Sequence, residues 1–286
     1  MSRANDPSNH LLTANLAKRV RVVQVSGEDS CTRADAAAAE EPLEVRVNGE
    51  PLAVVMRTPG ADAALTAGFL HAERVIRSSG DLKSLRRDDV APNVMHATLE
   101  ERASHEFARS AEVRRHVAMN ASCGICGRVT IESLRAEAPP IAAECSVQPA
   151  VIRALPRALR AAQAVFEKTG GLHAAGLFDL GGSIEAIAED IGRHNAVDKV
   201  IGRMLLENRL PLDRAVLFVS GRTSFEIVQK AFLAGIPILG AVSAPSSLAV
   251  ELADEAGITL LGFVRGDTFN IYSNPRRIRE TIASVP

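Results

Sequence analysis

The sequence contains no tryptophan and one tyrosine, and aromatic residues make up only 3% of its 286 residues. This scarcity argues against a surface that binds single-stranded nucleic acid by stacking bases on aromatic rings. An excess of one charge is also lacking, because 33 lysines and arginines nearly balance 34 aspartates and glutamates. A protein that coats duplex DNA carries a basic excess. We therefore expect no nucleic-acid partner.

Cysteine and long apolar runs are scarce as well. Four cysteines are too few for a disulfide scaffold in a chain of this length. The longest apolar run, from Ala231 to Ala244, contains Pro237 and is shorter than the ~18 residues that a membrane span needs. The N-terminus lacks the apolar core of a signal peptide. We therefore expect a soluble, cytoplasmic protein with reduced thiols and no membrane segment.

The apolar content, 47% of the residues, is enough for a sizeable core. We expect a mobile tail over residues 1–40, in which only Val20–Val25 alternates as a strand does, then an N-terminal α+β domain over 41–145 and an α/β domain over 146–286. In the N-terminal domain, Asn48-Gly49 lies between two alternating runs and predicts a hairpin. A helix is expected over 62–76, with strands over 94–99 and 107–119.

The C-terminal half has the more regular pattern. Continuously apolar strands alternate with amphipathic helices, which predicts a mostly parallel sheet covered on both faces. The expected strands are 172–180, 183–189, 215–219, 236–242 and 258–264, and the expected helices are 156–168, 195–206, 225–234 and 246–256.

The sharpest motif is a pair of cysteines, Cys123 and Cys126, on a loop that also carries Gly124 and Gly127. Two thiols at this spacing can bind a metal, form a redox disulfide or act as nucleophile and neighbour. A structural zinc site needs four ligands, and the other two cysteines have no partner in a zinc-ligand spacing, so we expect no zinc. The glycines favour an exposed loop that a large partner can approach, and nearby Arg128 favours the thiolate.

Two turns that follow buried strands, residues 220–224 and 243–247, present hydroxyl and backbone N–H groups where helices begin. Such turns bind phosphate, and they lie at the carboxyl ends of parallel strands, where open α/β sheets bind ligands. The alternative is simple N-capping of the helices by Ser224 and Ser246. The candidate phosphate-binding residues are Ser220, Gly221, Arg222, Ser243 and Ser246.

A polar stretch from Glu189 to Lys199 adjoins a strand end and a helix start. Capping of the helix explains Asn195, but it does not explain Asp190, Arg193 and His194 together. The individual roles of Asp190, His194 and Asp198 stay open at this point. His173, in a separate glycine-rich turn, is interpreted as a structural histidine.

Taken together, these segments resemble the FdhD family of formate dehydrogenase accessory sulfurtransferases, over about residues 43–275. The cysteine pair alone would not be specific, but the long polar blocks are. The matching blocks are Met56–Gly60, Gly68–Leu70, Cys123–Gly127, Gly171–Ala175, Glu189–Lys199, Ser220–Glu226, Ala241–Ser247 and Gly262–Gly266.

The resemblance implies that Cys123 takes sulfur from a cysteine desulfurase as a persulfide, with Cys126 as its less critical neighbour. The sulfur is then delivered to bis-molybdopterin guanine dinucleotide for insertion into formate dehydrogenase. The resemblance places the cofactor site at the C-terminal stretch, and we add His194 from the polar stretch. The residues of that C-terminal stretch are Phe263, Val264, Arg265, Gly266, Asp267 and Thr268.

The resemblance also implies a homodimer and a fold class: a C-terminal three-layer, cytidine-deaminase-like α/β domain beside a smaller N-terminal α+β domain. Deaminase chemistry is not expected. It requires a His-x-Glu motif, which is missing, and a proline before the first cysteine, where this chain has Ser122.

Three functions remain in competition. The first is sulfur transfer through Cys123. The second is a molybdenum-cofactor or guanine-nucleotide chaperone that performs no covalent chemistry, so that replacing Cys123 leaves its function intact. The third is a dithiol redox protein, in which the loss of Cys123 or of Cys126 is equally damaging.

Overall fold

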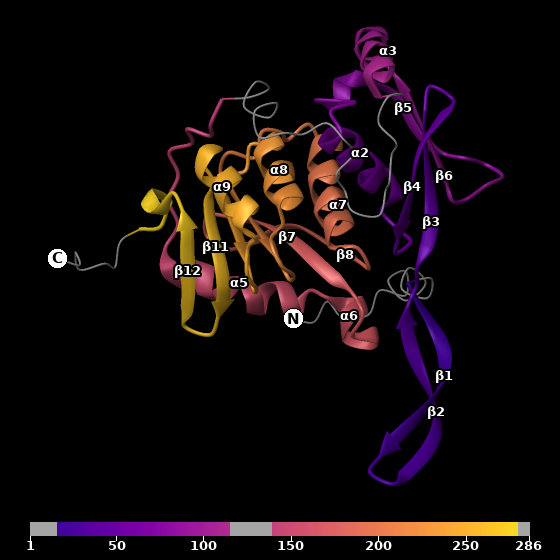
Figure 1. Ribbon diagram of the computed structural model, residues 1–286, viewed down its shortest axis with the longest axis vertical. Helices are drawn as coiled ribbons and strands as arrows, with labels where there is room; N and C mark the ends of the chain where they lie inside the picture. Colours follow the sequence, from indigo (N-terminus) through magenta and orange to yellow (C-terminus); the bar gives the residue numbers. More distant parts are fainter. Residues whose placement is uncertain (1–15, 115–138, 280–286) are drawn as a thin grey trace, which may run out of the picture.

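The computed structural model describes residues 16–114 and 139–279 (Figure 1). Cys123 and Cys126 lie outside the described residues. The described chain forms an N-terminal part built on a four-stranded sheet, a C-terminal part built on a six-stranded sheet, and a separate two-stranded ribbon.

The ribbon consists of β1 (Ala17–Ser26) and β2 (Asp29–Ala38), paired antiparallel along their whole length. The two-residue turn between them has a positive φ of 63° at Gly27, as a type II′ hairpin requires. The tail expected over residues 1–40 is thus replaced by a hairpin over Ala17–Ala38. Its second strand is rich in alanine and polar residues, so it lacks the apolar alternation that reveals a half-buried strand.

The N-terminal sheet has the order β4-β3-β6-β5. The predicted hairpin is confirmed, with Asn48 and Gly49 both at positive φ. Helix α2 (Asp62–Ala72) packs beside the sheet, and a short 3₁₀ helix covers Ser79–Asp81. The strands are β3 (Glu41–Val47), β4 (Glu50–Arg57), β5 (Leu82–Arg87) and β6 (Val94–Leu99).

The strand predicted over residues 107–119 is wrong over 107–114, which belong to α3 (Glu101–Arg114); residues 115–119 lie outside the described residues. Ala103 and Phe107 recur at helical spacing and join the core under the N-terminal sheet. The ion pair between Arg102 and Glu106, at 3.6 Å, has the i,i+4 spacing of a helix surface.

The C-terminal sheet has the order β12-β11-β10-β9-β7-β8. Strands β9, β10 and β11 are parallel to one another, whereas β7, β8 and β12 are antiparallel to their neighbours, so the sheet is mixed. The strands are β7 (His173–Asp179), β8 (Ile184–Asp190), β9 (Ala215–Val219), β10 (Ile238–Ala241), β11 (Thr259–Arg265) and β12 (Thr268–Ser273).

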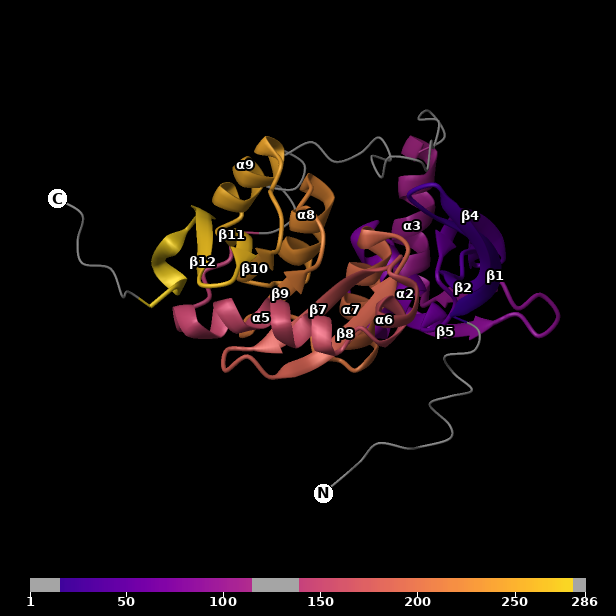
Figure 2. The same cartoon turned by 90° about the horizontal axis from the view of Figure 1, so that it is seen from below.

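Helices cover both faces of this sheet, which confirms a three-layer α/β domain (Figure 2). Helices α7 (Arg193–Leu206), α8 (Phe225–Leu233) and α9 (Ser247–Glu255) pack on one face, and α5 (Pro149–Ala161) packs on the other. The single helix predicted over 156–168 is two helices, α5 and α6 (Ala164–Thr169). A 3₁₀ helix, Pro275–Arg277, follows β12. No helix of the described residues is both long and apolar enough to cross a membrane.

Two glycines allow the N-terminal and C-terminal parts to pack closely against each other. A Cβ atom on Gly68 of α2 would lie 2.0 Å from the carbonyl oxygen of Asp198, and one on Gly202 of α7 would lie 1.9 Å from that of Ala64. Real Cβ atoms never come so close, so the two helix backbones touch where side chains would hold them apart. This contact brings the N-terminal part against the polar start of α7.

Candidate functional site

The predicted phosphate-binding turns meet at one edge of the C-terminal sheet. Strands β8, β9, β10 and β11 all end there, and β7 begins there. The two turns are joined by backbone pairing, since the N–H of Thr223 donates to the oxygen of Ala244 at 3.2 Å. The Ser220 hydroxyl accepts a hydrogen bond from the N–H of Ala174 at 2.8 Å, which fixes the first turn to β7.

The capping alternative holds for one serine only. The Ser246 hydroxyl accepts a hydrogen bond from the N–H of Ala249 at 3.3 Å, as an N-cap does. The Ser224 side chain caps nothing in its own helix and instead lies 2.9 Å from Nε2 of His194. The second turn therefore has an ordinary structural explanation, whereas the first turn is tied to the polar stretch at the start of α7.

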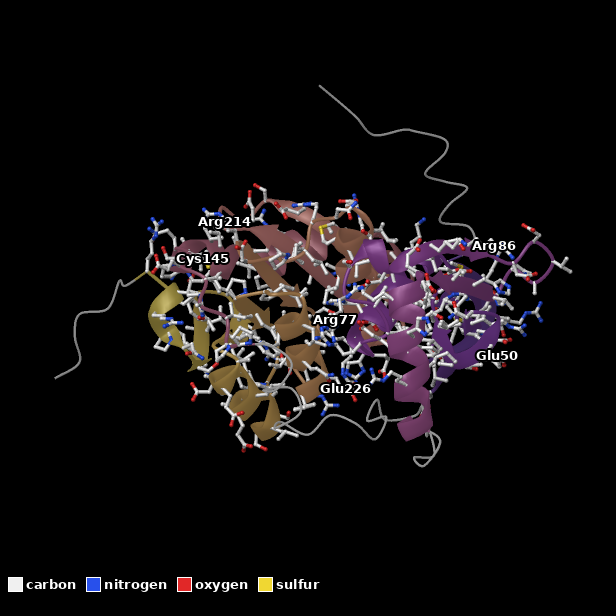
Figure 3. All side chains as sticks on the ribbon, turned by 90° about the horizontal axis from the view of Figure 1, so that it is seen from above. Glu50, Arg77, Arg86, Cys145, Arg214 and Glu226 are labelled. Atoms are coloured by element: carbon white, nitrogen blue, oxygen red, sulfur yellow. The ribbon has the colours of Figure 1, made fainter. Side chains whose placement is uncertain are left out.

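The ring of His194 lies between Ser224 and Glu226, whose carboxylate oxygen is 3.1 Å from the same Nε2 atom. Burial is the main reason that the pKa of His194 falls to about 4, and the nearby charge of Arg193 lowers it further. The ring is therefore neutral at pH 7. Burial also raises the pKa of Glu226, which lies where α8 faces the N-terminal part (Figure 3).

The second histidine of the site comes from the start of β7. A Cβ atom on Gly221 would lie 3.3 Å from Nδ1 of His173 and 3.8 Å from Cδ of Arg193, so glycine leaves room for both side chains. Burial, together with the charge of Arg193, lowers the pKa of His173. We call His173, Arg193, His194, Gly221, Ser224 and Glu226 the edge site.

Two buried polar atoms at this edge lack a hydrogen-bond partner within the described residues. They are Nε of Arg193 and the hydroxyl of Thr223, a residue that is only 1% exposed. An unsatisfied buried donor is costly unless a ligand or water meets it. Neutral histidines, a free guanidinium N–H and a hydroxyl form a donor set that suits an anion such as phosphate.

The C-terminal stretch expected to hold the cofactor forms the turn between β11 and β12, which extends beyond the ends of the neighbouring strands (Figure 1). Phe263 is 39% exposed with a positive φ of 51°. The guanidinium of Arg265 lies 5.7 Å from the centre of its ring and donates to the oxygen of Val242 at 2.8 Å. Residues 266–268 are exposed.

Val264 is the exception in that stretch. Its side chain is fully buried and belongs to the apolar core beside α5. The alternation of a strand explains the difference, because successive side chains point to opposite faces. Val264 therefore packs in the core under the turn, and its side chain is not accessible to a ligand.

The carboxylate of Asp190 fixes the position of the residues that begin α7, next to the edge site. One carboxylate oxygen accepts from the N–H of Gly192 at 2.8 Å and from the amide of Asn195 at 2.9 Å. The other lies 2.7 Å from the Lys199 ammonium and accepts from the N–H of Thr58 at 3.1 Å. This buried pair ties the loop after β4 to the start of α7, and so unites two motifs that lie far apart in the sequence.

Asp198 forms a second buried pair, 2.7 Å from the ammonium of Lys230. Burial raises the pKa of Asp198 to about 6, although Lys230 opposes the shift. The three residues left open by the sequence thus separate: Asp190 and Asp198 are structural partners of buried lysines, and His194 belongs to the edge site. Among the described residues, no cluster of three His, Cys, Asp or Glu side chains is placed to hold a metal ion.

Sequence reasoning missed the part that Glu226 and His173 play in the edge site. Neither residue had a clear signal in the sequence. Residues two apart on a helix do not share a face, so the spacing of Ser224 and Glu226 does not reveal that both reach His194; the packing of α8 beside α7 brings them there. The antiparallel pairing of β7 with β9 brings His173 to this edge.

The family model described as FdhD/NarQ matches residues 38–279. A sulfur carrier protein FdhD from Nocardia farcinica is 49% identical over 96% of this chain and 99% of its own. One from Sulfolobus acidocaldarius is 44% identical over 91% of this chain and 98% of its own. A crystal structure from Desulfotalea psychrophila, of a protein proposed to be a formate dehydrogenase accessory protein, has a TM-score of 0.74 at 24% identity, covering 92% of this chain and 99% of that one. The chain therefore belongs to the FdhD/NarQ family.

Proposed function

We propose that this chain is a sulfur carrier and sulfurtransferase, which accepts sulfur from a cysteine desulfurase as a persulfide on Cys123. It passes that sulfur to the bis-molybdopterin guanine dinucleotide cofactor, and formate dehydrogenase receives the sulfurated cofactor. The single observation that carries the proposal is kinship over nearly the whole chain, at 44–49% identity, with proteins named sulfur carrier protein FdhD.

The loading step is a thiol exchange. The Cys123 thiolate attacks the outer sulfur of the donor's persulfide, and a sulfur–sulfur bond forms to Cys123. The bond between that sulfur and the donor cysteine breaks, and the donor leaves as a thiolate, so no oxidant is needed. Arg128 favours the attacking thiolate, and Gly124 and Gly127 keep bulk away from it. Cys126 is a neighbour with a lesser role.

The cofactor is the substrate that receives the sulfur, and its two guanine nucleotides bring several phosphates. The edge site supports its binding, because an unpartnered guanidinium N–H and a buried hydroxyl lie at the carboxyl ends of the strands. The exposed turn between β11 and β12 lies at the same edge of the sheet, with Phe263 offering an apolar ring face. In this assignment Arg222, which is exposed, holds a phosphate at the mouth of the site.

We further propose that the protein acts in the cytoplasm as a homodimer. Its protein partners are a cysteine desulfurase, which donates sulfur, and a formate dehydrogenase, which receives the cofactor. Among the relatives, the name sulfur carrier supports the transfer role.

Complementation of a strain that lacks the protein tests the proposal. Cys123→Ala abolishes formate dehydrogenase activity, because the carrier atom is gone, whereas Cys126→Ala retains most of it. A chaperone that performs no covalent chemistry predicts the reverse of the first result: Cys123→Ala complements and Arg222→Ala does not. Equal loss from both cysteine variants would instead favour a dithiol redox protein.

A further inference from the structure

The ribbon of β1 and β2, which we call the arm, runs away from the rest of the molecule (Figure 1). The arm contacts the rest of the described chain at its base. Lys18 pairs with Glu41 at 3.3 Å, and Ala38 lies beside Gly171, which follows α6. Within the described residues, neither strand of the arm pairs with any other strand. An isolated two-stranded hairpin is only marginally stable in water, so we expect an arm of this length to be stabilised by a binding partner.

The arm exposes apolar side chains that a lone ribbon has no reason to carry. Val23 and Val25 are 65% and 68% exposed, and they lie on the same face because residues two apart in a strand share a face. Val20 is 37% exposed on the other face. An apolar, unpaired edge strand is the feature through which strands of different chains associate.

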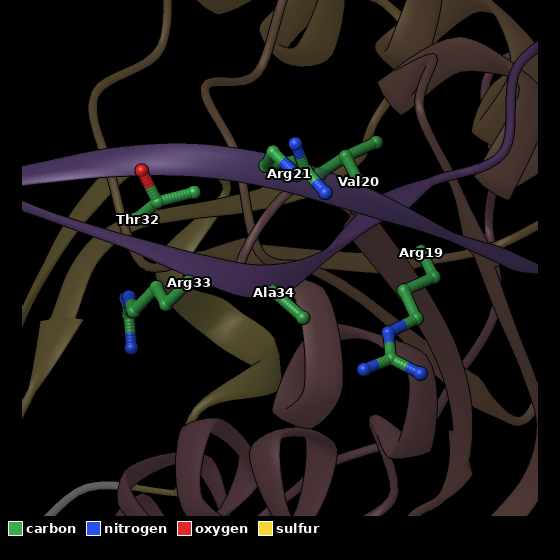
Figure 4. Close-up of a pocket in the computed structure, with 6 residues that line it drawn as sticks. All are labelled: Arg19, Val20, Arg21, Thr32, Arg33 and Ala34. Atoms are coloured by element: carbon green, nitrogen blue, oxygen red, sulfur yellow. The ribbon is translucent and has the colours of Figure 1, made fainter.

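The charges of the arm are divided along its length. The base half of β1 carries Lys18, Arg19 and Arg21, and the tip carries Glu28 in the turn and Asp29 at the start of β2. On β2, Arg33 and Asp35 pair with each other at 3.6 Å. An open hollow of about 440 Å³ lies along the basic half, lined by residues of both strands (Figure 4). Its lining residues are Arg19, Val20, Arg21, Thr32, Arg33 and Ala34.

We propose that the arm pairs with the arm of a second copy of this chain, β1 against β1, antiparallel about a two-fold axis near Gln24. The proposal rests on the homodimer proposed above and assigns its interface. Antiparallel pairing sets the basic base of each arm beside the acidic tip of the other, and it places Val23 and Val25 of the two copies next to one another. A two-fold contact of this kind is self-complementary and closed, as dimer interfaces are.

Sedimentation of the full chain tests the interface. The wild-type chain sediments at twice the chain mass, and Val23→Lys with Val25→Lys raises the dissociation constant of the dimer at least tenfold. Both side chains are largely exposed, so these changes remove no core contact. Val54→Lys with Met56→Lys, at 54% and 49% exposure on the edge strand β4, is the matched control and leaves the dimer intact.

A charge exchange makes the test sharper. Arg19→Glu with Arg21→Glu weakens the dimer, and adding Glu28→Lys with Asp29→Lys restores it. Asp29 pairs with Ser26, so even Arg21 and Asp29, the nearest of these charges, lie about five residues apart along the arm, roughly 17 Å, and the rescue can act only between two copies. A monomeric wild-type chain, a dimer unaffected by the valine changes, or no rescue would each overturn the proposal. Sulfur loading on Cys123 is measured separately, so failure of the carrier function does not alter the sedimentation result.

Discussion

At the scale of single residues, the edge site depends on groups that burial keeps uncharged. His194 has a pKa of about 4 and is neutral at pH 7, and burial lowers the pKa of His173 as well; the side chain of Arg193 lies beside both rings. A neutral imidazole next to a guanidinium donates a hydrogen bond to an anion and adds no second charge. The cation of the edge site is therefore the guanidinium of Arg193, whose Nε–H has no hydrogen-bond partner within the described residues.

Replacement of that cation is expected to weaken nucleotide binding. Arg193→Gln removes a charge-assisted hydrogen bond worth about 1.5–3 kcal/mol, so the affinity for GDP falls by roughly 10–100-fold. Isothermal titration of the full chain with GDP measures the change. Arg102→Gln, which removes a cation on α3 whose side chain is 70% exposed, serves as the control. Equal affinity in wild type and Arg193→Gln would remove this residue from the site.

At the scale of elements, the contact between α2 and α7 depends on two glycines. Gly68 and Gly202 let the two backbones touch, and this contact holds the loop after β4 against Asp190. The sequence pattern shows both helices but not their close approach, because a glycine inside a helix carries no sign of what lies opposite.

A methyl group at this contact is expected to separate the helices. Gly202→Ala would place its Cβ atom 1.9 Å from the carbonyl oxygen of Ala64, and the required shift costs about 3 kcal/mol or more of unfolding free energy. Gly80→Ala is the control, since its Cβ atom meets nothing closer than 3.6 Å. Urea denaturation compares the two variants, and equal midpoints would contradict the close packing.

Whether the sequence predicts a helix or strand depends on how deeply that element is buried. The strands β9, β10 and β11 are apolar on both faces and were predicted, and the turn residues Asn48 and Gly49 marked the first hairpin. The arm, α3 and β12 were missed or misassigned because each is largely exposed and its side chains carry little periodic apolar signal. The same holds for the edge site. The sequence predicts its turns, but the proximity of His173 and Arg193 depends on the order of the strands in the sheet.

At the scale of the whole molecule, buried titratable groups couple stability to pH. The pKa of His71 is lowered to about 4, chiefly by burial, as is that of His194. Both folded-state values lie below the ordinary one, so as the pH falls from about 6.5 towards 4 the unfolded chain takes up protons first and stability is lost. Asp198, with its pKa raised to about 6, acts in the opposite direction over about pH 6 to 4.

The two histidines outweigh the aspartate, so the free energy of unfolding is expected to fall by about 2–3 kcal/mol between pH 7 and pH 5. His71→Gln makes this fall smaller, because the amide keeps a donor for the oxygen of Leu233 and does not titrate. Urea denaturation at the two pH values measures both quantities. A pH dependence that His71→Gln leaves unchanged would show that this histidine does not contribute.

The central claim is that Cys123 carries sulfur, and peptide mass spectrometry tests it most directly. The full chain is incubated with a cysteine desulfurase and cysteine, then digested without reducing agent. We expect an adduct of about 32 Da, one sulfur atom, on the peptide that contains Cys123, present in Cys126→Ala and absent in Cys123→Ala. If the wild-type chain gains no sulfur, or if Cys123→Ala gains as much as the wild type, Cys123 is not the sulfur carrier.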